Sequence, residues 1–138
     1  MLTNAENARL FSTKETKSHE RYVDCCRCGR LKTLHERQFP ATKVRAFASA
    51  RSAGSKVPFG EEELTVEELK EDVFDGIDLA IFSAGGGTSA KFAPHAAHAG
   101  CVVVDNSAAW RMDERCPLVV PEVNPEALEE HQGIIANP

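Results

Sequence analysis

The sequence is poor in aromatic residues and has no long apolar run. Its 138 residues contain a single Trp and a single Tyr. No apolar run approaches the roughly 20 residues that a membrane-spanning helix needs, and the chain does not open on the apolar stretch of a secretory signal. The formal net charge of −5 disfavours a general nucleic-acid or membrane-surface role. The length fits one domain with a core of its own.

Cysteine and histidine are too few and too irregular for a disulfide scaffold or a metal centre. Five cysteines, an odd number, favour a reducing compartment. Cys25, Cys26 and Cys28 contain one C-x-x-C spacing, but no second pair follows at the spacing of a four-ligand zinc site. His95 and His98 are three residues apart and do not close a site alone. We therefore predict free thiols and no metal.

The first thirty residues differ in kind from the others. They are polar and have no sustained period of helix or strand, so we predict that residues 1–30 form a leader that is disordered or weakly helical, or that is unrelated to the domain that follows. An organelle transit segment is the alternative, although the three Glu residues of this stretch count against it. Residues 31–138 are expected to form an α/β domain.

The most informative stretch is an apolar run at residues 77–82 that leads directly into a loop with three glycines, residues 83–88. A short apolar run that ends in glycine is typical of a buried parallel strand. Residues 89–99 predict a helix with Gly100 as its C-cap, and residues 101–104 predict a second buried strand. This β-loop-α-β unit requires parallel strands.

We expect further elements on both sides of this unit. Thr65 and Glu68 match a capping box and predict a short helix that runs to about Asp72. An acidic, solvated turn is expected at residues 60–63, and Asp75-Gly76 should turn the chain into the central strand. The remaining expectations are a helical segment at 31–35, a strand at 43–48, a short strand or extended segment at 118–120, a helix at 124–130 and a last strand at 133–136.

Two loops are expected beyond the carboxyl ends of these strands, where ligands bind in parallel sheets. The glycines of residues 83–88 let a ligand approach the backbone closely. In residues 105–111, Arg111 offers a planar fork for a phosphate or carboxylate. Arg51 follows another predicted strand, and it could recognise an anion or lie in an ordinary exposed turn. The residues alone leave both interpretations of Arg51 open.

Seven segments fall in the order and spacing of one known family. They are E-R-Q-F-P (36–40), A-S-A-R-S-A-G (48–54), E-L-T-V-E-E-L (63–69), F-S-A-G-G (82–86), V-D-N-S-A-A-W-R-M (104–112), P-E-V-N-P-E-A-L (121–128) and I-A-N-P (135–138). Residues 36–138 thereby resemble the N-terminal nucleotide-binding domain of the aspartate-semialdehyde dehydrogenases. The resemblance implies a doubly wound, Rossmann-like parallel sheet. It also implies reduction of L-4-aspartyl phosphate by NADPH, a step of lysine, threonine and methionine biosynthesis.

The resemblance gives roles to nine residues. Those that match the cofactor site are Arg51 and Ser52, which hold the 2′-phosphate of NADP, and Ser83, Ala84, Gly85 and Gly86, which lie along the cofactor. Those that match the substrate site are Arg111, which binds the phosphate of the substrate, and Asn106 and Ser107, which line the same pocket. Trp110 stands where relatives usually have phenylalanine.

Two departures from the family pattern concern the ends of the chain. In relatives a first strand and a G-x-x-G-x-x-G turn bind the pyrophosphate, and here residues 1–30 take their place. The nucleophilic cysteine of relatives follows Asn137-Pro138 after one further Asn. We therefore expect a sheet truncated at both ends, a partial domain at residues 31–138, no catalytic residue, and no activity of this chain alone.

Two other functions stay open at this stage. One is a non-catalytic module that binds a nucleotide or anion or pairs with a full-length subunit. The other is a relative of N-acetylglutamyl-phosphate reductase, against which the signatures at residues 51–54 and 106–111 argue. In each case we expect a small-molecule ligand, with no nucleic-acid or membrane partner, and homo-oligomeric full-length relatives. The expected location is cytoplasmic, or plastid if residues 1–30 belong to a transit segment.

Overall fold

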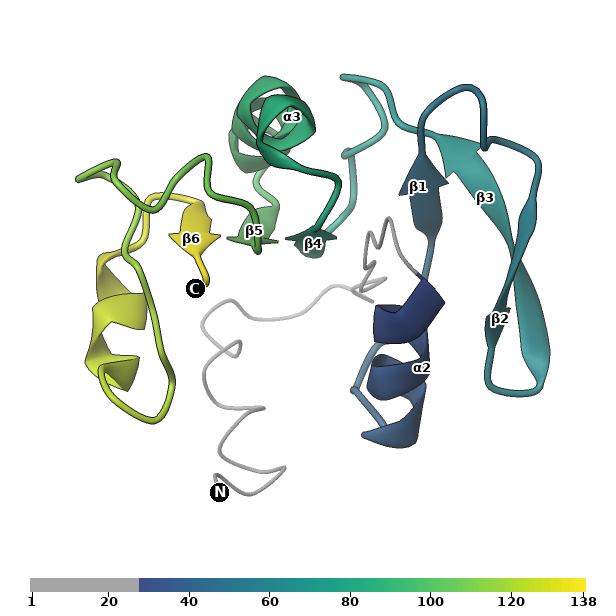
Figure 1. Cartoon of the computed structure of the whole chain (residues 1–138), viewed down its shortest axis with the longest axis horizontal. Coiled ribbons are helices and arrows are strands. Elements are labelled where there is room, and N and C mark those ends of the chain that lie inside the picture. Colours follow the sequence, from purple (N-terminus) through teal and green to yellow (C-terminus); the bar gives the residue numbers. More distant parts are fainter. Residues whose placement is uncertain (1–27) are drawn as a thin grey trace.

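The computed structural model describes residues 28–138, which form an α/β arrangement (Figure 1). Most of the predicted leader, with Cys25 and Cys26, lies outside the described residues. The elements are α2 (Cys28–Glu36), β1 (Ala46–Ala48), β2 (Lys56–Phe59), β3 (Glu62–Glu68), β4 (Leu79–Phe82), α3 (Gly86–His98), β5 (Val102–Asp105), the 3-10 helix η1 (Pro125–Glu130) and β6 (Ile134–Ala136). None of the helices described is long and apolar enough to cross a membrane.

The predicted β-loop-α-β unit is confirmed. Strands β4, β5 and β6 form a three-stranded sheet in that order, and both pairings are parallel. Ala80, Phe82 and Val103 are fully buried in this sheet, which explains why its strands read as short apolar runs. Gly100 has φ of 87° and ends α3 as expected. Figure 1 shows α3 on one side of the strands and α2 and η1 on the other, as in a doubly wound sheet.

A second sheet has the order β1-β3-β2, with β1 parallel and β2 antiparallel to β3. The expected acidic turn at residues 60–63 is shorter than predicted. Phe59 pairs with Glu62, so that only Gly60 and Glu61 form the turn of a β-hairpin. Gly60 has φ of 64°, a conformation that two-residue hairpin turns favour and that glycine adopts without strain.

The predicted capping box at Thr65 and Glu68 is wrong, because these residues lie in β3. No helix forms between Glu68 and Asp72, and residues 71–76 are a turn. Val66 is buried against Leu31 and Ala46, while β1 and β2 pair with the two edges of the strand. Pairing with β1 and β2 satisfies the backbone hydrogen bonds of this strand. The free energy gained from this pairing and from the burial of Val66 exceeds the weak local preference for a helix start.

One apolar core joins the two sheets. Phe47 of β1 lies in the same buried cluster as Ala80 and Phe82 of β4 and Ala93 and Ala96 of α3. Small alanines on the inner face of α3 allow the helix to pack closely on the sheet. This core therefore holds the carboxyl end of β1 near that of β4, which positions the loops that come after them.

Candidate functional site

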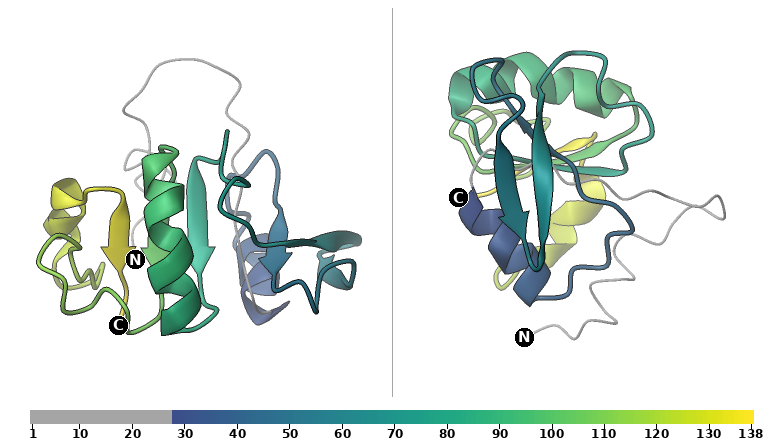
Figure 2. Two further views of the ribbon diagram at one scale, coloured as in Figure 1. Left: turned by 90° about the horizontal axis from the view of Figure 1, so that it is seen from above. Right: turned by 90° about the vertical axis from the view of Figure 1, so that its right-hand side faces the viewer.

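The carboxyl ends of the parallel strands lie at one edge of the molecule. In the left-hand view of Figure 2 the arrows of β1, β4 and β6 point the same way. The segments that leave this edge are residues 49–54 after β1, 83–85 after β4, 106–111 after β5, and Asn137 after β6. Every residue predicted to bind a ligand is in one of these segments or, in the case of Gly86, at the first position of α3.

A pocket of about 530 Å³ opens between the ends of β1 and β4. Its lining comes from both sheets and from α3, and consists of Ala48, Ser49, Ser52, Leu69, Ser83, Ala84, Gly85, Thr88 and Phe92. Four of the six predicted cofactor residues are among them, whereas Arg51 and Gly86 are not. Sequence reasoning gave no role to Thr88, which it placed in the glycine loop, or to Phe92, which it placed in the helix that follows; both lie in α3. None of the residues that line the pocket is charged, and the lining residues that come from the loops have small side chains.

The glycine loop leaves the start of α3 open. Gly85 is the N-cap residue with φ of 92°, and no side chain caps the helix. A Cβ built on Gly85 would meet nothing within 4 Å, so the absence of a side chain leaves room at this position. Uncapped N–H groups and the helix dipole favour an anionic or polar ligand at such an end. The helix begins three residues before the predicted Ser89, which brings its N-terminus to the wall of the pocket.

Arg51 lies on a compact loop after β1. The N–H groups of Ser52 and Ala53 both donate to the Ser49 carbonyl, at 2.9 and 3.1 Å, and the Gly54 N–H donates to Val66 of β3 at 2.8 Å. Gly54 has φ of 83°. Arg51 itself is exposed and makes no ion pair within residues 28–138. Its guanidinium is therefore available to an anion beside the pocket.

Arg111 joins the ends of β5 and β6. Its Nε donates to the Asn137 carbonyl at 3.1 Å and its Nη2 donates to the Asn106 carbonyl at 3.2 Å. The Asn137 side-chain amide donates to Asn106 Oδ1, and the Asn137 N–H donates to the Asp105 carbonyl at 2.8 Å. Two guanidinium N–H groups are thus occupied, and the others remain for a ligand. The structure brings Arg111 and Asn106 together as expected, and their roles toward a substrate stay predictions.

Ser107 has a structural use for its hydroxyl group. The Ser107 hydroxyl donates to Asp105 Oδ2 at 2.6 Å and accepts the Ala109 N–H at 3.1 Å. Asp105 is fully buried, and its Oδ1 has no hydrogen-bond partner among residues 28–138. Ser107 therefore holds the turn that leads to Arg111, in addition to any predicted contact with a ligand. Sequence reasoning gave no role to Asp105, although it begins the predicted loop, or to Asn137, which meets this loop only through the fold.

Cys101 and Cys116 are not exposed nucleophiles. They are 1% and 8% exposed, and neither is in a disulfide bond within residues 28–138. Burial raises the pKa of the Cys116 thiol, with a smaller effect of the nearby Asp113 carboxylate. A thiol whose pKa is raised is largely protonated at neutral pH and reacts slowly. Within residues 28–138, no cluster of three or more His, Cys, Asp or Glu side chains could hold a metal ion.

Sequence comparisons point to one family. The family model described as "Semialdehyde dehydrogenase, NAD binding domain" matches residues 30–131. The aspartate-semialdehyde dehydrogenase of Bacillus subtilis is 53% identical over 108 residues, which are 78% of this chain and 31% of the relative. That of Aquifex aeolicus is 55% identical over 111 residues, 78% of this chain and 33% of the relative. The chain thus spans about a third of the length of these curated relatives.

Solved structures agree with these matches. Aspartate semialdehyde dehydrogenase II from Vibrio cholerae, solved in a complex with ASA, matches with a TM-score of 0.78 and 43% sequence identity. The match covers 85% of this chain and 41% of the Vibrio cholerae chain. Aspartate semialdehyde dehydrogenase from Candida albicans, solved with NADP, has a TM-score of 0.66 at 22% identity, over 86% of this chain and 42% of its own. The second likeness concerns the fold alone.

Proposed function

Since this chain belongs to the semialdehyde dehydrogenase family through its NAD binding domain, we propose that it is the NADP-binding part of an aspartate-semialdehyde dehydrogenase. The observation that carries the proposal is that two candidate sites lie at one edge of the molecule, beyond the carboxyl ends of β1, β4 and β5. The pocket after β1 and β4 suits a nucleotide cofactor, and Arg111 after β5 suits a phosphate. An acyl-phosphate reductase needs both.

The assignment of the reaction follows from the relatives and from the chemistry of the edge. We assign to the whole enzyme the reductive dephosphorylation of L-4-aspartyl phosphate to L-aspartate 4-semialdehyde, in lysine, threonine and methionine biosynthesis. NADPH, the reduced form of the cofactor, would supply the hydride when it is bound. Arg111 would bind the phosphate group of the substrate through the N–H groups that Asn106 and Asn137 leave unused, because its fork matches the oxyanion geometry.

Preference for NADP over NAD is assigned to Arg51 and Ser52. Ser52 lines the pocket, and Arg51 is exposed next to it on the same loop. The residues fit the ribose end of a dinucleotide, because a guanidinium and a hydroxyl group are the donors that a 2′-phosphate requires. The loop of Ser83, Ala84 and Gly85 would lie alongside the cofactor. Gly86 and the uncapped N-terminus of α3 directly follow this loop.

We further propose that the 138-residue chain alone is inactive. Cys101 and Cys116 are both buried, and burial raises the pKa of the Cys116 thiol, whereas acyl-phosphate reduction through a thioester requires an accessible nucleophile. The purified chain, incubated with aspartate semialdehyde, phosphate and NADP, should give no reduced cofactor above a blank. Turnover of about 1 per second or faster, as in ordinary enzymes, would contradict this proposal.

The burial of Cys101 and Cys116 also favours a second candidate, a non-catalytic module that binds a nucleotide or anion or pairs with a full-length subunit. Relatedness to N-acetylglutamyl-phosphate reductase is less favoured, since the Bacillus and Aquifex relatives are named aspartate-semialdehyde dehydrogenases. We propose a cytoplasmic location for the enzyme, with a plastid one as the alternative, and a homo-oligomeric full-length form that acts on small molecules.

A residue-resolved titration tests the proposed function. Isotope-labelled chain is titrated with NADP and, separately, with inorganic phosphate, while the backbone amides are followed by NMR. NADP should shift the signals of Ser52, Gly85 and Thr88, and phosphate should shift those around Arg111. Shifts that spread evenly over the surface, or none at either site, would count against the assignment.

A further inference from the structure

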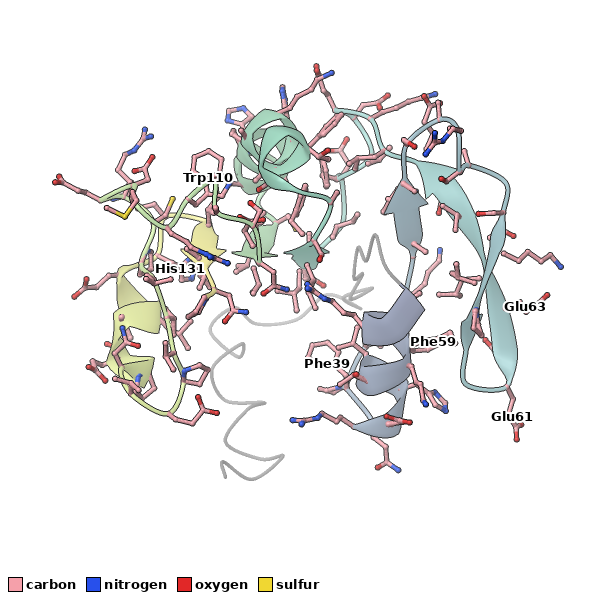
Figure 3. All side chains as sticks on the ribbon, viewed as in Figure 1. Phe39, Phe59, Glu61, Glu63, Trp110 and His131 are labelled. Atoms are coloured by element: carbon pink, nitrogen blue, oxygen red, sulfur yellow. The ribbon has the colours of Figure 1, made fainter. Side chains whose placement is uncertain are left out.

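Trp110 connects the Arg111 loop to helix α3. It is the single tryptophan of the chain, and its indole Nε1–H donates to Ser89 Oγ at 2.9 Å. Ser89 lies in the first turn of α3 and is fully buried. The ring is partly buried and packs against the main core cluster; Figure 3 shows it beside α3. A phenylalanine could fill the same space but could not donate this hydrogen bond.

A second contact lies next to this bond. A Cβ built on Gly86, the first residue of α3, would stand 4.0 Å from the Ala109 Cβ, so the loop runs along the start of the helix. The Trp110 carbonyl accepts the Asp113 N–H at 3.1 Å and closes the turn that contains Arg111. The loop is therefore attached to α3 on one side of Arg111, while the Asn106 and Asn137 carbonyls hold the guanidinium itself.

We propose that Trp110 is a positioning residue that holds Arg111 at a fixed place relative to the glycine loop. The inference rests on the proposed function, in which Arg111 and the glycine loop bind the two reactants. Residues 85–89 carry both the wall of the pocket and the acceptor for Trp110, so one hydrogen bond ties the two halves of the site together. An arginine side chain that is already fixed before the ligand binds loses less conformational entropy on binding.

A purely packing role for Trp110 makes a different prediction. In that case the aromatic ring alone would matter, and Trp110→Phe would leave Arg111 unchanged because the core contact is largely retained. Under our proposal the N–H donor matters, and removal of either partner has the same effect. Ser89→Ala deletes only the acceptor, leaves the tryptophan ring in place, and keeps the test valid even if Trp110→Phe fails to fold.

The experiment uses the complete 138-residue chain without ligand. NMR follows the solvent exchange and the relaxation of the Arg111 Nε–H group in wild type, Trp110→Phe, Ser89→Ala and the double variant. We expect about tenfold faster exchange in each single variant, the factor that corresponds to about 1.4 kcal/mol. The double variant should be no faster than either single one, because both changes remove the same interaction.

Ser55→Ala is the matched control. It removes a hydroxyl group that donates to the Ser52 carbonyl at 2.7 Å on an exposed loop, and it should leave Arg111 exchange as in wild type. Unchanged exchange in both single variants, or additive effects in the double variant, would overturn the proposal. Because no ligand is added, a chain that shows the Arg111 response but binds neither NADP nor phosphate would overturn the proposed function and retain the role of Trp110.

Discussion

At the scale of single residues, the edge that carries the site depends on a few positions where only one residue type fits. Gly133, just before β6, is one of them. It has φ of 103°, and a Cβ at this position would lie 2.8 Å from the Cβ of Ala97 in α3. Gly133 therefore lets β6 approach the helix, and with it places Asn137 next to Arg111.

We expect Gly133→Ala to lower the free energy of unfolding by about 2–3 kcal/mol, because strained backbone and overpacking act together. Gly76→Ala is the control: Gly76 also has positive φ, 76°, but nothing lies within 4 Å of its built Cβ. That variant should lose only about 1 kcal/mol. Urea titrations of both variants measure the difference. Equal losses would mean that contact with Ala97 contributes nothing.

Cys116 should respond to alkaline pH. Burial raises its pKa in the folded chain above the ordinary value of 9.0, so the unfolded chain releases this proton first. The contribution of this pKa difference to the free energy of unfolding is fully present below pH 9.0 and is lost as the pH rises through the pKa of Cys116 in the folded chain. Unfolding titrations from neutral to alkaline pH should show a fall in stability that Cys116→Ala reduces. The same slope in both chains would refute the burial argument.

At the scale of elements, sequence patterns predicted the structure well wherever the decisive signal was local. The strands β4, β5 and β6 are short apolar runs bounded by glycine or polar residues, and Gly100 ends α3 as its sequence indicates. The start of α3 was placed late, because Gly86 and Gly87 are weak helix formers. A helix is predicted at 65–68 because Thr65 and Glu68 match a capping box, whereas the pairing of Val66 with Ala46 of β1 joins residues distant in sequence.

The same distinction explains what could be predicted of the candidate site. Arg51, Gly85 and Arg111 were found because their residue types suggest chemistry and because they follow predicted strands. The Asn137–Arg111 and Trp110–Ser89 hydrogen bonds join residues 26 and 21 positions apart. No local pattern encodes such contacts, and only the parallel order of the strands and the packing of α3 bring them about.

Strand β3 should contribute a pH dependence on the acid side. The Arg45 guanidinium donates two hydrogen bonds to Glu67, at 2.7 and 2.5 Å, across the β1–β3 pair. The hydrogen bond from Arg45 is the main cause that lowers the pKa of Glu67 below its ordinary 4.5. The stabilisation is therefore present above pH 4.5 and is lost as the pH falls through the pKa of Glu67 in the folded chain.

Glu67→Gln should reduce the loss of stability on acidification from neutral pH to about pH 3, as measured by urea unfolding at a series of pH values. The effect should be small, because the Glu67 side chain is 43% exposed and solvent screens such pairs. Glu63→Gln, which removes an exposed ion pair with Lys56 at 3.3 Å, serves as the control. If both substitutions changed the acid loss of stability equally, the Arg45–Glu67 contact would contribute no more than an exposed ion pair.

At the scale of the whole molecule, the domain has two candidate ligand-binding sites at the edge where β1, β4 and β5 end. The pocket after β1 and β4 and the Arg111 loop after β5 are held together by α3 and by a shared core. The sequence carries no G-x-x-G-x-x-G turn, which would contribute several charge-assisted hydrogen bonds to a pyrophosphate, each of about 1.5–3 kcal/mol. Cofactor binding by this chain should consequently be selective but weak.

Calorimetric titration of the chain with NADP and with NAD, in wild type and in Arg51→Ala, tests the proposed cofactor site most directly. We expect binding of NADP in the range of about 1 mM or weaker, less binding of NAD, and loss of the difference in Arg51→Ala, because only NADP presents a 2′-phosphate to this side chain. Tight binding, or equal affinity of the wild-type chain for the two cofactors, would contradict the assignment of the pocket and of Arg51.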